Sequence, residues 1–267
     1  MDAQTRARRL GLANTPTVAP MSGVYYESSD AKCKRALAKL GAVRVNVLPM
    51  RNVKSARTLE DNVQRGAICA LSDALCHMYT TDAHMQTAIV DAFVRDDTSP
   101  RVAKGAIKNG CVIEVLSFDF DLSDHATGRM TDETFKTVVT EMRSSPTLNG
   151  AVFYATRGGL RALVPLAKPF EIRADHGEDW TAFYTEIVSS LPSSTLGAWD
   201  AACGDVPRLY RLPRVIRDEV PQTGLIFVPD AVTPYILTNK DREVILNASL
   251  PKSATSSAVS GDGLISF

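Results

Sequence analysis

The amino-acid sequence predicts an α+β (α/β) fold in which helices flank a mixed or antiparallel sheet. Its 267 residues are enough to bury a full hydrophobic core. Strand-like apolar runs are interspersed along the chain with segments whose apolar residues recur at helical spacing. The longest strand-like run, residues 111–121, lies near the middle of the chain and ends in two carboxylates. This run predicts a central buried strand that carries a site.

Charge and cysteine content limit the classes of protein that this chain can be. Thirty Lys and Arg side chains balance thirty Asp and Glu side chains, so binding of nucleic acid would need a local basic patch. The five cysteines have no paired CxxC spacing, which is typical of free thiols in a reducing compartment. No run approaches the roughly 18 apolar residues of a membrane span, and the start has no apolar signal segment. We therefore expect a cytoplasmic protein with no membrane partner.

The first hundred residues predict one strand and three helices. Residues 1–30 show no sustained period and are expected to form a flexible arm. A short helix is expected over residues 30–40, and a strand over residues 43–48. Apolar residues at helical spacing predict a helix from Thr58 to Met78 and a second helix over residues 83–95.

The second half predicts the order strand, helix, hairpin. The central strand ends at Asp121, and Thr131, followed by two acidic residues, predicts a helix start. An apolar strand over residues 151–155 is followed by the glycine turn at residues 157–159 and a returning strand over residues 160–166.

Beyond the hairpin, the chain predicts one more helix and then a tail. Residues 180–191 show the clearest amphipathic pattern in the sequence, which is typical of a core helix. Residues 251–267 are rich in serine and resemble a linker. We therefore expect one catalytic domain over residues 31–250.

Three aspartates are candidate metal ligands. Asp119 and Asp121 share one face of the central strand because side chains alternate along a strand. Two adjacent acids repel each other, and a cation between them relieves the repulsion, although two solvated acids at a strand end remain an alternative. Asp200 is the third candidate. Carboxylates suit Mg²⁺ or Mn²⁺, so we expect a divalent cation at these acids. Asp119→Ala should leave the metal-free stability unchanged or slightly raised.

Arginines and glycines later in the chain predict a site for phosphates. Glycine amides can approach a phosphate closely because no Cβ intervenes, and a guanidinium matches phosphate oxygens. The candidate nucleotide-binding residues are Arg157, Gly158, Gly159, Arg161, Arg208 and Arg211.

The order of these motifs resembles the archaeo-eukaryotic primase superfamily, and within it the primase-polymerase type found in phages and plasmids. The motifs are residues 118–121 (FDFD), 156–161 (TRGGLR), 199–200 (WD) and 208–213 (RLYRLP). The resemblance implies that the three acids bind two divalent metals and that the glycine turn helps to hold the triphosphate. This chain has Arg161 where the family usually has a histidine. An arginine can hold a triphosphate but cannot shuttle a proton.

The resemblance implies a DNA primase/polymerase that uses nucleoside triphosphates to make primers on a single-stranded DNA template during replication. A fused or associated helicase is an implied partner, and the protein would be encoded by a phage or a plasmid. Two alternatives remain open. A haloacid-dehalogenase-like phosphatase also places Asp-x-Asp after an apolar strand, with the first Asp as nucleophile. A non-catalytic nucleic-acid-binding replication initiator would fit the missing histidine.

Overall fold

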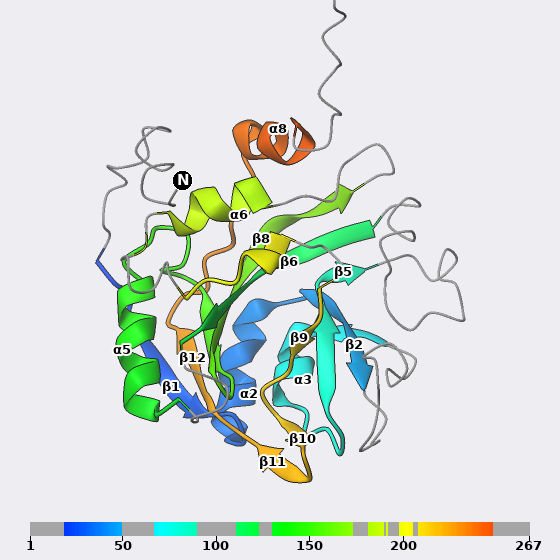
Figure 1. Ribbon diagram of the computed structural model, residues 1–267, viewed down its shortest axis with the longest axis vertical. Helices are drawn as coiled ribbons and strands as arrows, with labels where there is room; N and C mark the ends of the chain where they lie inside the picture. Colours follow the sequence, from blue (N-terminus) through cyan, green and yellow to red (C-terminus); the bar gives the residue numbers. More distant parts are fainter. Residues whose placement is uncertain are drawn as a thin grey trace, which may run out of the picture.

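The computed structural model describes residues 19–49, 67–89, 111–122, 130–172, 181–189, 191, 198–204 and 208–247. Within these residues the chain forms a six-stranded sheet, a four-stranded sheet and a two-stranded ribbon, and helices pack against the sheets (Figure 1). All pairs of named strands are antiparallel, which confirms the α+β class. No helix in the described part combines the length and the apolar character that crossing a membrane requires.

The elements up to the central strand are β1 (Gly23–Glu27), α2 (Ala31–Leu37), η1 (Ala38–Leu40), β2 (Arg44–Pro49), β3 (Ala67–Ala70), α3 (Leu71–Cys76), β4 (Ala83–Gln86), β5 (Ala88–Ile89) and β6 (Cys111–Asp121). They are followed by α5 (Asp132–Met142), β7 (Val152–Ala155), β8 (Gly159–Ile172), α6 (Thr181–Val188), η3 (Ala201–Gly204), β9 (Tyr210–Arg211), β10 (Val215–Arg217), β11 (Val220–Gln222), β12 (Leu225–Pro229) and α8 (Asn239–Asn247).

The six-stranded sheet has the order β1-β12-β7-β8-β6-β5 and presents two different faces. Residues directly opposite each other on paired strands project to the same face. One such row contains Phe118, Phe153 and Phe227, which are buried aromatic residues. This face is covered by helices, because Phe118 contacts Tyr184 of α6 at a ring separation of 4.8 Å and α5 packs on β12. The neighbouring row, which includes Asp119 and Arg161, lies on the opposite face.

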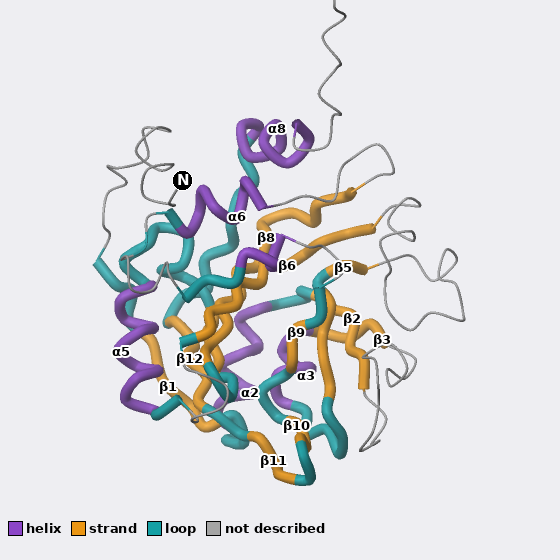
Figure 2. The backbone as a smooth tube through the Cα atoms, in the orientation of Figure 1, coloured by secondary structure: helices purple, strands orange, loops and turns teal. Residues whose placement is uncertain are grey.

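The four-stranded sheet, β3-β2-β4-β9, lies next to the larger sheet through β2, which contacts β5 and β6 (Figure 2). Helices α2 and α3 pack on each other, with α2 against β1 and β12 and α3 against β2 and β3. Helices α6 and α8 lie together at the top of the view in Figure 1. This arrangement leaves the polar row of the six-stranded sheet facing β9 and the β10-β11 ribbon.

Most elements predicted in the second half are confirmed. The central strand ends at Asp121 as expected, and the Thr131 side chain caps α5 by accepting from the Thr134 amide at 3.1 Å. The predicted hairpin corresponds to β7 and β8. In the first half, the helix after Asp30 and the strand after Val43 are confirmed.

Three predictions in the first half are wrong. Ala67–Ala70 is strand β3, so only Leu71–Cys76 is helical where a helix to Met78 was expected. Residues 83–89 form β4 and β5 instead of a helix. The sequence of β4, AHMQ, does alternate apolar and polar residues, but four residues are too few to outweigh the helical spacing of Met85 and Ile89. Gly23–Glu27 of the expected arm forms β1, whose partner β12 lies some two hundred residues away in the chain. The tail 251–267 and the helix start at Thr58 lie outside the described residues.

Candidate functional site

A buried ion pair occupies the polar face of the six-stranded sheet. Asp119 of β6 lies directly opposite Arg161 of β8. The Arg161 Nε donates to Asp119 Oδ1 at 3.1 Å, and its Nη2 donates to Oδ2 at 3.0 Å. Each side chain is only 9% exposed. Register and alternation therefore produce a bidentate charged pair, the strongest geometry of this kind.

Arg161 has further partners that fix its position. Its Nη1 donates to the Tyr154 hydroxyl at 3.3 Å and to the carbonyl oxygen of Arg211. Its guanidinium carbon lies 5.4 Å from the centre of the Tyr210 ring. Burial acts to lower the pKa of Arg161, but Tyr154 and Asp119 raise it above its ordinary value, so the side chain stays charged.

An open pocket lies beside this pair, and we call it the arginine pocket. Its lining includes four arginines and three aspartates contributed by strands β6, β8, β9 and β10, the glycine turn and the start of α5. They are Arg157, Arg161, Arg211, Arg217, Asp119, Asp121 and Asp132. The pocket thus collects charged side chains from segments that are up to about a hundred residues apart in the sequence.

Asp121 reaches the pocket from the end of β6. It lies on the same face as Asp119 and is exposed. The residue directly opposite on β8 is Gly159, so no β8 side chain faces Asp121 in the register. A Cβ at Gly159 would lie 1.7 Å from the Phe120 carbonyl oxygen, which only glycine avoids.

The glycine turn uses one of its backbone donors internally. The Gly159 amide donates to Thr156 Oγ1 at 3.1 Å, so that donor is used inside the turn. The Gly158 carbonyl accepts from the Leu122 amide at 2.9 Å, which ties the turn to the end of β6. Gly158 lines the pocket, but Gly159 does not. The turn therefore acts mainly as a support that carries Arg157 to the rim.

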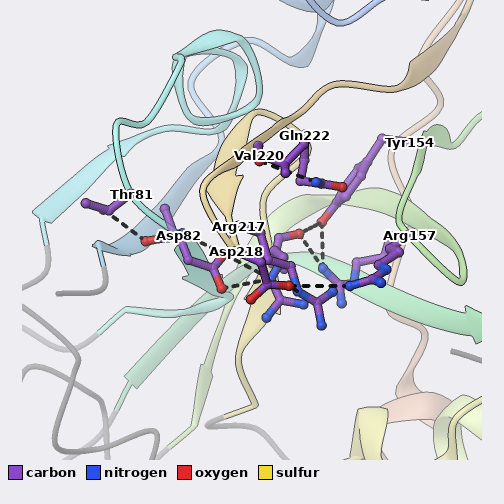
Figure 3. Close-up of polar contacts among 11 residues, drawn as sticks. Thr81, Asp82, Tyr154, Arg157, Arg217, Asp218, Val220 and Gln222 are labelled. Carbon is purple, nitrogen blue, oxygen red and sulfur yellow. Dashed lines mark hydrogen bonds and ion pairs between the residues drawn. The ribbon is translucent and has the colours of Figure 1, made fainter. Parts of the chain in front are cut away.

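Three guanidinium groups meet at the opening of the pocket. Arg157 and Arg217 both contact Asp218, at 3.5 and 3.7 Å, at the tip of the β10-β11 hairpin (Figure 3). Arg211 is paired with Asp82 at 2.9 Å. Burial and then the charges of Arg211 and Arg157 lower the pKa of Arg217. The cations repel one another, and a bound anion would relieve that repulsion.

Asp200 is brought next to Asp119 by the backbone. Its amide donates to the Asp119 carbonyl at 2.9 Å, and Trp199 forms an antiparallel bridge with Phe120. Its side chain serves other contacts, because Oδ1 accepts from the Ala202 amide at 2.9 Å and Oδ2 from Arg208. Neither Asp200 nor Arg208 lines the arginine pocket.

The predicted metal ligands differ in how well they suit a divalent ion. Carboxylate oxygen is the right donor, and exposed Asp121 in the pocket fits this chemistry. Both oxygens of Asp119 already accept hydrogen bonds from a guanidinium, which would repel a metal ion at the same position. Among the described residues, no group of three or more His, Cys, Asp or Glu side chains is arranged to hold a metal ion. Asp121 therefore suits a metal ion, whereas Asp119 is already paired with the guanidinium of Arg161.

Several residues that line the pocket or contact its arginines were not singled out from the sequence. Tyr154 and Tyr210 enclose Arg161, and Arg217 and Asp218 come from a hairpin with no family motif. The run Asp218-Glu219-Val220-Pro221 indicates a turn in the sequence. It does not indicate that this turn lies next to the pocket.

Comparison of this chain with family models, with curated proteins and with solved structures gives no match.

Proposed function

We propose that the arginine pocket binds the triphosphate of a nucleotide and that this chain is a DNA primase-polymerase, which makes primers on single-stranded DNA by template-directed nucleotidyl transfer. The supporting observation is the convergence of Arg157, Arg211 and Arg217 on a pocket that also contains Asp121. Guanidinium groups bind phosphate oxygens through paired hydrogen bonds. Three of them drawn from separate segments suit a ligand with several phosphates.

The chain's own residues would bind and orient the nucleotide. The arginines at the opening would hold the phosphates, while Arg161, fixed by Asp119 and Tyr154, would present a constant positive charge below them. A divalent ion, when bound, would lower the pKa of the attacking 3′-hydroxyl, and Asp121 is the carboxylate that fits as its ligand. Holding the reacting groups in one geometry is itself a large part of such catalysis.

One observation favours a second candidate, a non-catalytic replication initiator that binds nucleic acid. The bidentate contact with Arg161 removes Asp119 from the set of available metal ligands. The same contact disfavours the phosphatase alternative, because the nucleophile there must reach the substrate and Asp119 is only 6% exposed.

Nucleotide affinity tests the pocket directly. We expect Arg157→Ala and Arg217→Ala each to weaken binding of a fluorescent nucleoside triphosphate in EDTA by about tenfold, since a charged hydrogen bond contributes ~1.5–3 kcal/mol. Arg35→Ala is the matched control, because Arg35 is exposed on α2 and does not line the pocket. Equal affinities in all three variants and the wild type would remove the pocket from nucleotide binding.

Primer synthesis distinguishes the two candidate functions. The protein is incubated with single-stranded DNA, labelled nucleotides and Mg²⁺ or Mn²⁺, and the products are separated on a gel. A primase-polymerase yields extended products that Asp121→Asn abolishes. An initiator binds DNA without extension. Because phosphate contacts are screened by salt, DNA binding should weaken as salt concentration rises.

A further inference from the structure

The Arg161 guanidinium is a fixed cation beside Asp119. A two-ion site of the kind that the sequence predicts needs Asp119 as a ligand. In the structure its two carboxylate oxygens accept from two nitrogens of one guanidinium, at 3.1 and 3.0 Å. The position in front of Asp119 is therefore already filled by a positive charge.

Arg161 is held too firmly to step aside for a metal ion. Its side chain is 9% exposed and contacts Tyr154, the Arg211 carbonyl and the Tyr210 ring as well as Asp119. Moving it would leave the carboxylate of Asp119 buried without its counter-ion. The strand register places the two residues opposite each other, so the pairing belongs to the fold of the sheet and not to a mobile surface contact.

We propose that the Arg161 guanidinium takes the place of one of the two divalent ions beside Asp119, so that the site binds at most one divalent ion. This inference rests on the proposed function in taking the pocket as a nucleotide site, but it concerns the metal count alone. A guanidinium can neutralise phosphate charge, yet it does not exchange with solvent and it does not polarise a bound water as a metal ion does. The nucleotide pocket would thus have one permanent cation and no more than one exchangeable cation.

The experiment counts bound Mn²⁺ on the whole chain without nucleotide, from the loss of the free-ion signal in electron paramagnetic resonance. We expect the wild type to bind no more than one ion. Arg161→His, which removes the permanent charge at neutral pH, should add one ion per chain. The matched control is Arg157→Ala, which removes a pocket charge that does not touch Asp119 and should leave the count unchanged.

Two ions on the wild type, or no additional ion in a folded Arg161→His, would overturn the inference. If Arg161→His does not fold, Asp119→Asn decides the matter. It should leave the wild-type count unaltered, because Asp119 is not a ligand, and a count reduced by one would show that it is. None of these outcomes depends on polymerase activity, and nucleotide binding in EDTA tests the proposed function separately.

Discussion

Two acid–arginine pairs lie on adjacent backbone segments, and they differ in burial and in origin. Asp119 and Arg161 are each 9% exposed and share two hydrogen bonds across neighbouring strands. Asp200 and Arg208 are 28% and 25% exposed, and only one arginine nitrogen contacts the acid. The second oxygen of Asp200 accepts from the Ala202 amide at the start of η3.

The difference shows what each pair does. The first is created by strand register inside the sheet, so each partner neutralises a charge that water cannot reach. The second is created by residues eight positions apart and stabilises a local turn, with water still close to both groups. Residue types that look equivalent in the sequence therefore have a core role in one pair and a peripheral role in the other.

The largest effect should come from breaking the buried pair. Arg161→Leu is expected to lower the free energy of unfolding by about 3–5 kcal/mol, because it leaves Asp119 buried without a counter-ion. Arg208→Ala should lower it by about 1 kcal/mol or less. Urea titrations in metal-free buffer measure both values. Equal losses would mean that burial does not separate the two pairs.

Removing both partners of the buried pair should recover much of that loss. The double variant Asp119→Leu/Arg161→Leu is expected to be at least about 2 kcal/mol more stable than the sum of the single variants predicts. The pairing also reverses the expectation from the sequence that Asp119→Ala preserves or raises stability. That single variant should instead be destabilised, because it leaves the buried Arg161 charge without its counter-ion.

His84 is a buried titratable group without an ion-pair partner among the described residues, and it should make the stability of the protein depend on pH. His84 of β4 is 5% exposed, its Nδ1 has no hydrogen-bond partner, and burial lowers its pKa to about 3. The unfolded chain binds this proton below pH ~6.5 and the folded protein does not, so stability is full above that pH and falls as pH drops. We expect a loss of about 2 kcal/mol between pH 6.5 and pH 5. His84→Gln should flatten that slope, and an unchanged slope would assign it to other groups.

The smallest effect concerns the backbone at the tip of the β10-β11 hairpin, next to the exposed ion pairs of Asp218. Glu219 has a φ of 65°, a left-handed conformation that glycine adopts without steric cost. Glu219→Gly is expected to raise the free energy of unfolding by ~0.5–1 kcal/mol and to leave the Arg157 and Arg217 contacts with Asp218 in place. Glu243→Gly in α8 is the control and should lower stability, since glycine weakens a helix. Thermal unfolding compares the two variants.

Local patterns accounted for the second half of the chain better than for the first. Thr131 followed by two acids gave the start of α5, and the glycine turn gave the β7-β8 hairpin, because caps and tight turns are encoded by neighbouring residues. The helix expected over residues 83–95 is wrong over residues 83–89, because β4 owes its conformation to pairing with β2 and β9 on either side. Its four alternating residues are too few to predict that pairing.

The sequence alone determined that Asp119 and Asp121 share a face and that residues 157–159 form a tight turn, since alternation and turn chemistry are local. Only the tertiary structure decided what each side chain contacts. The pairing of β6 with β8 places Asp119 opposite Arg161, and Asp200 just before the η3 turn pairs with Arg208. The β10-β11 hairpin brought Arg217 to the pocket. These contacts join residues that are distant in the chain, and their energies depend on burial, a property that no short stretch of sequence possesses by itself.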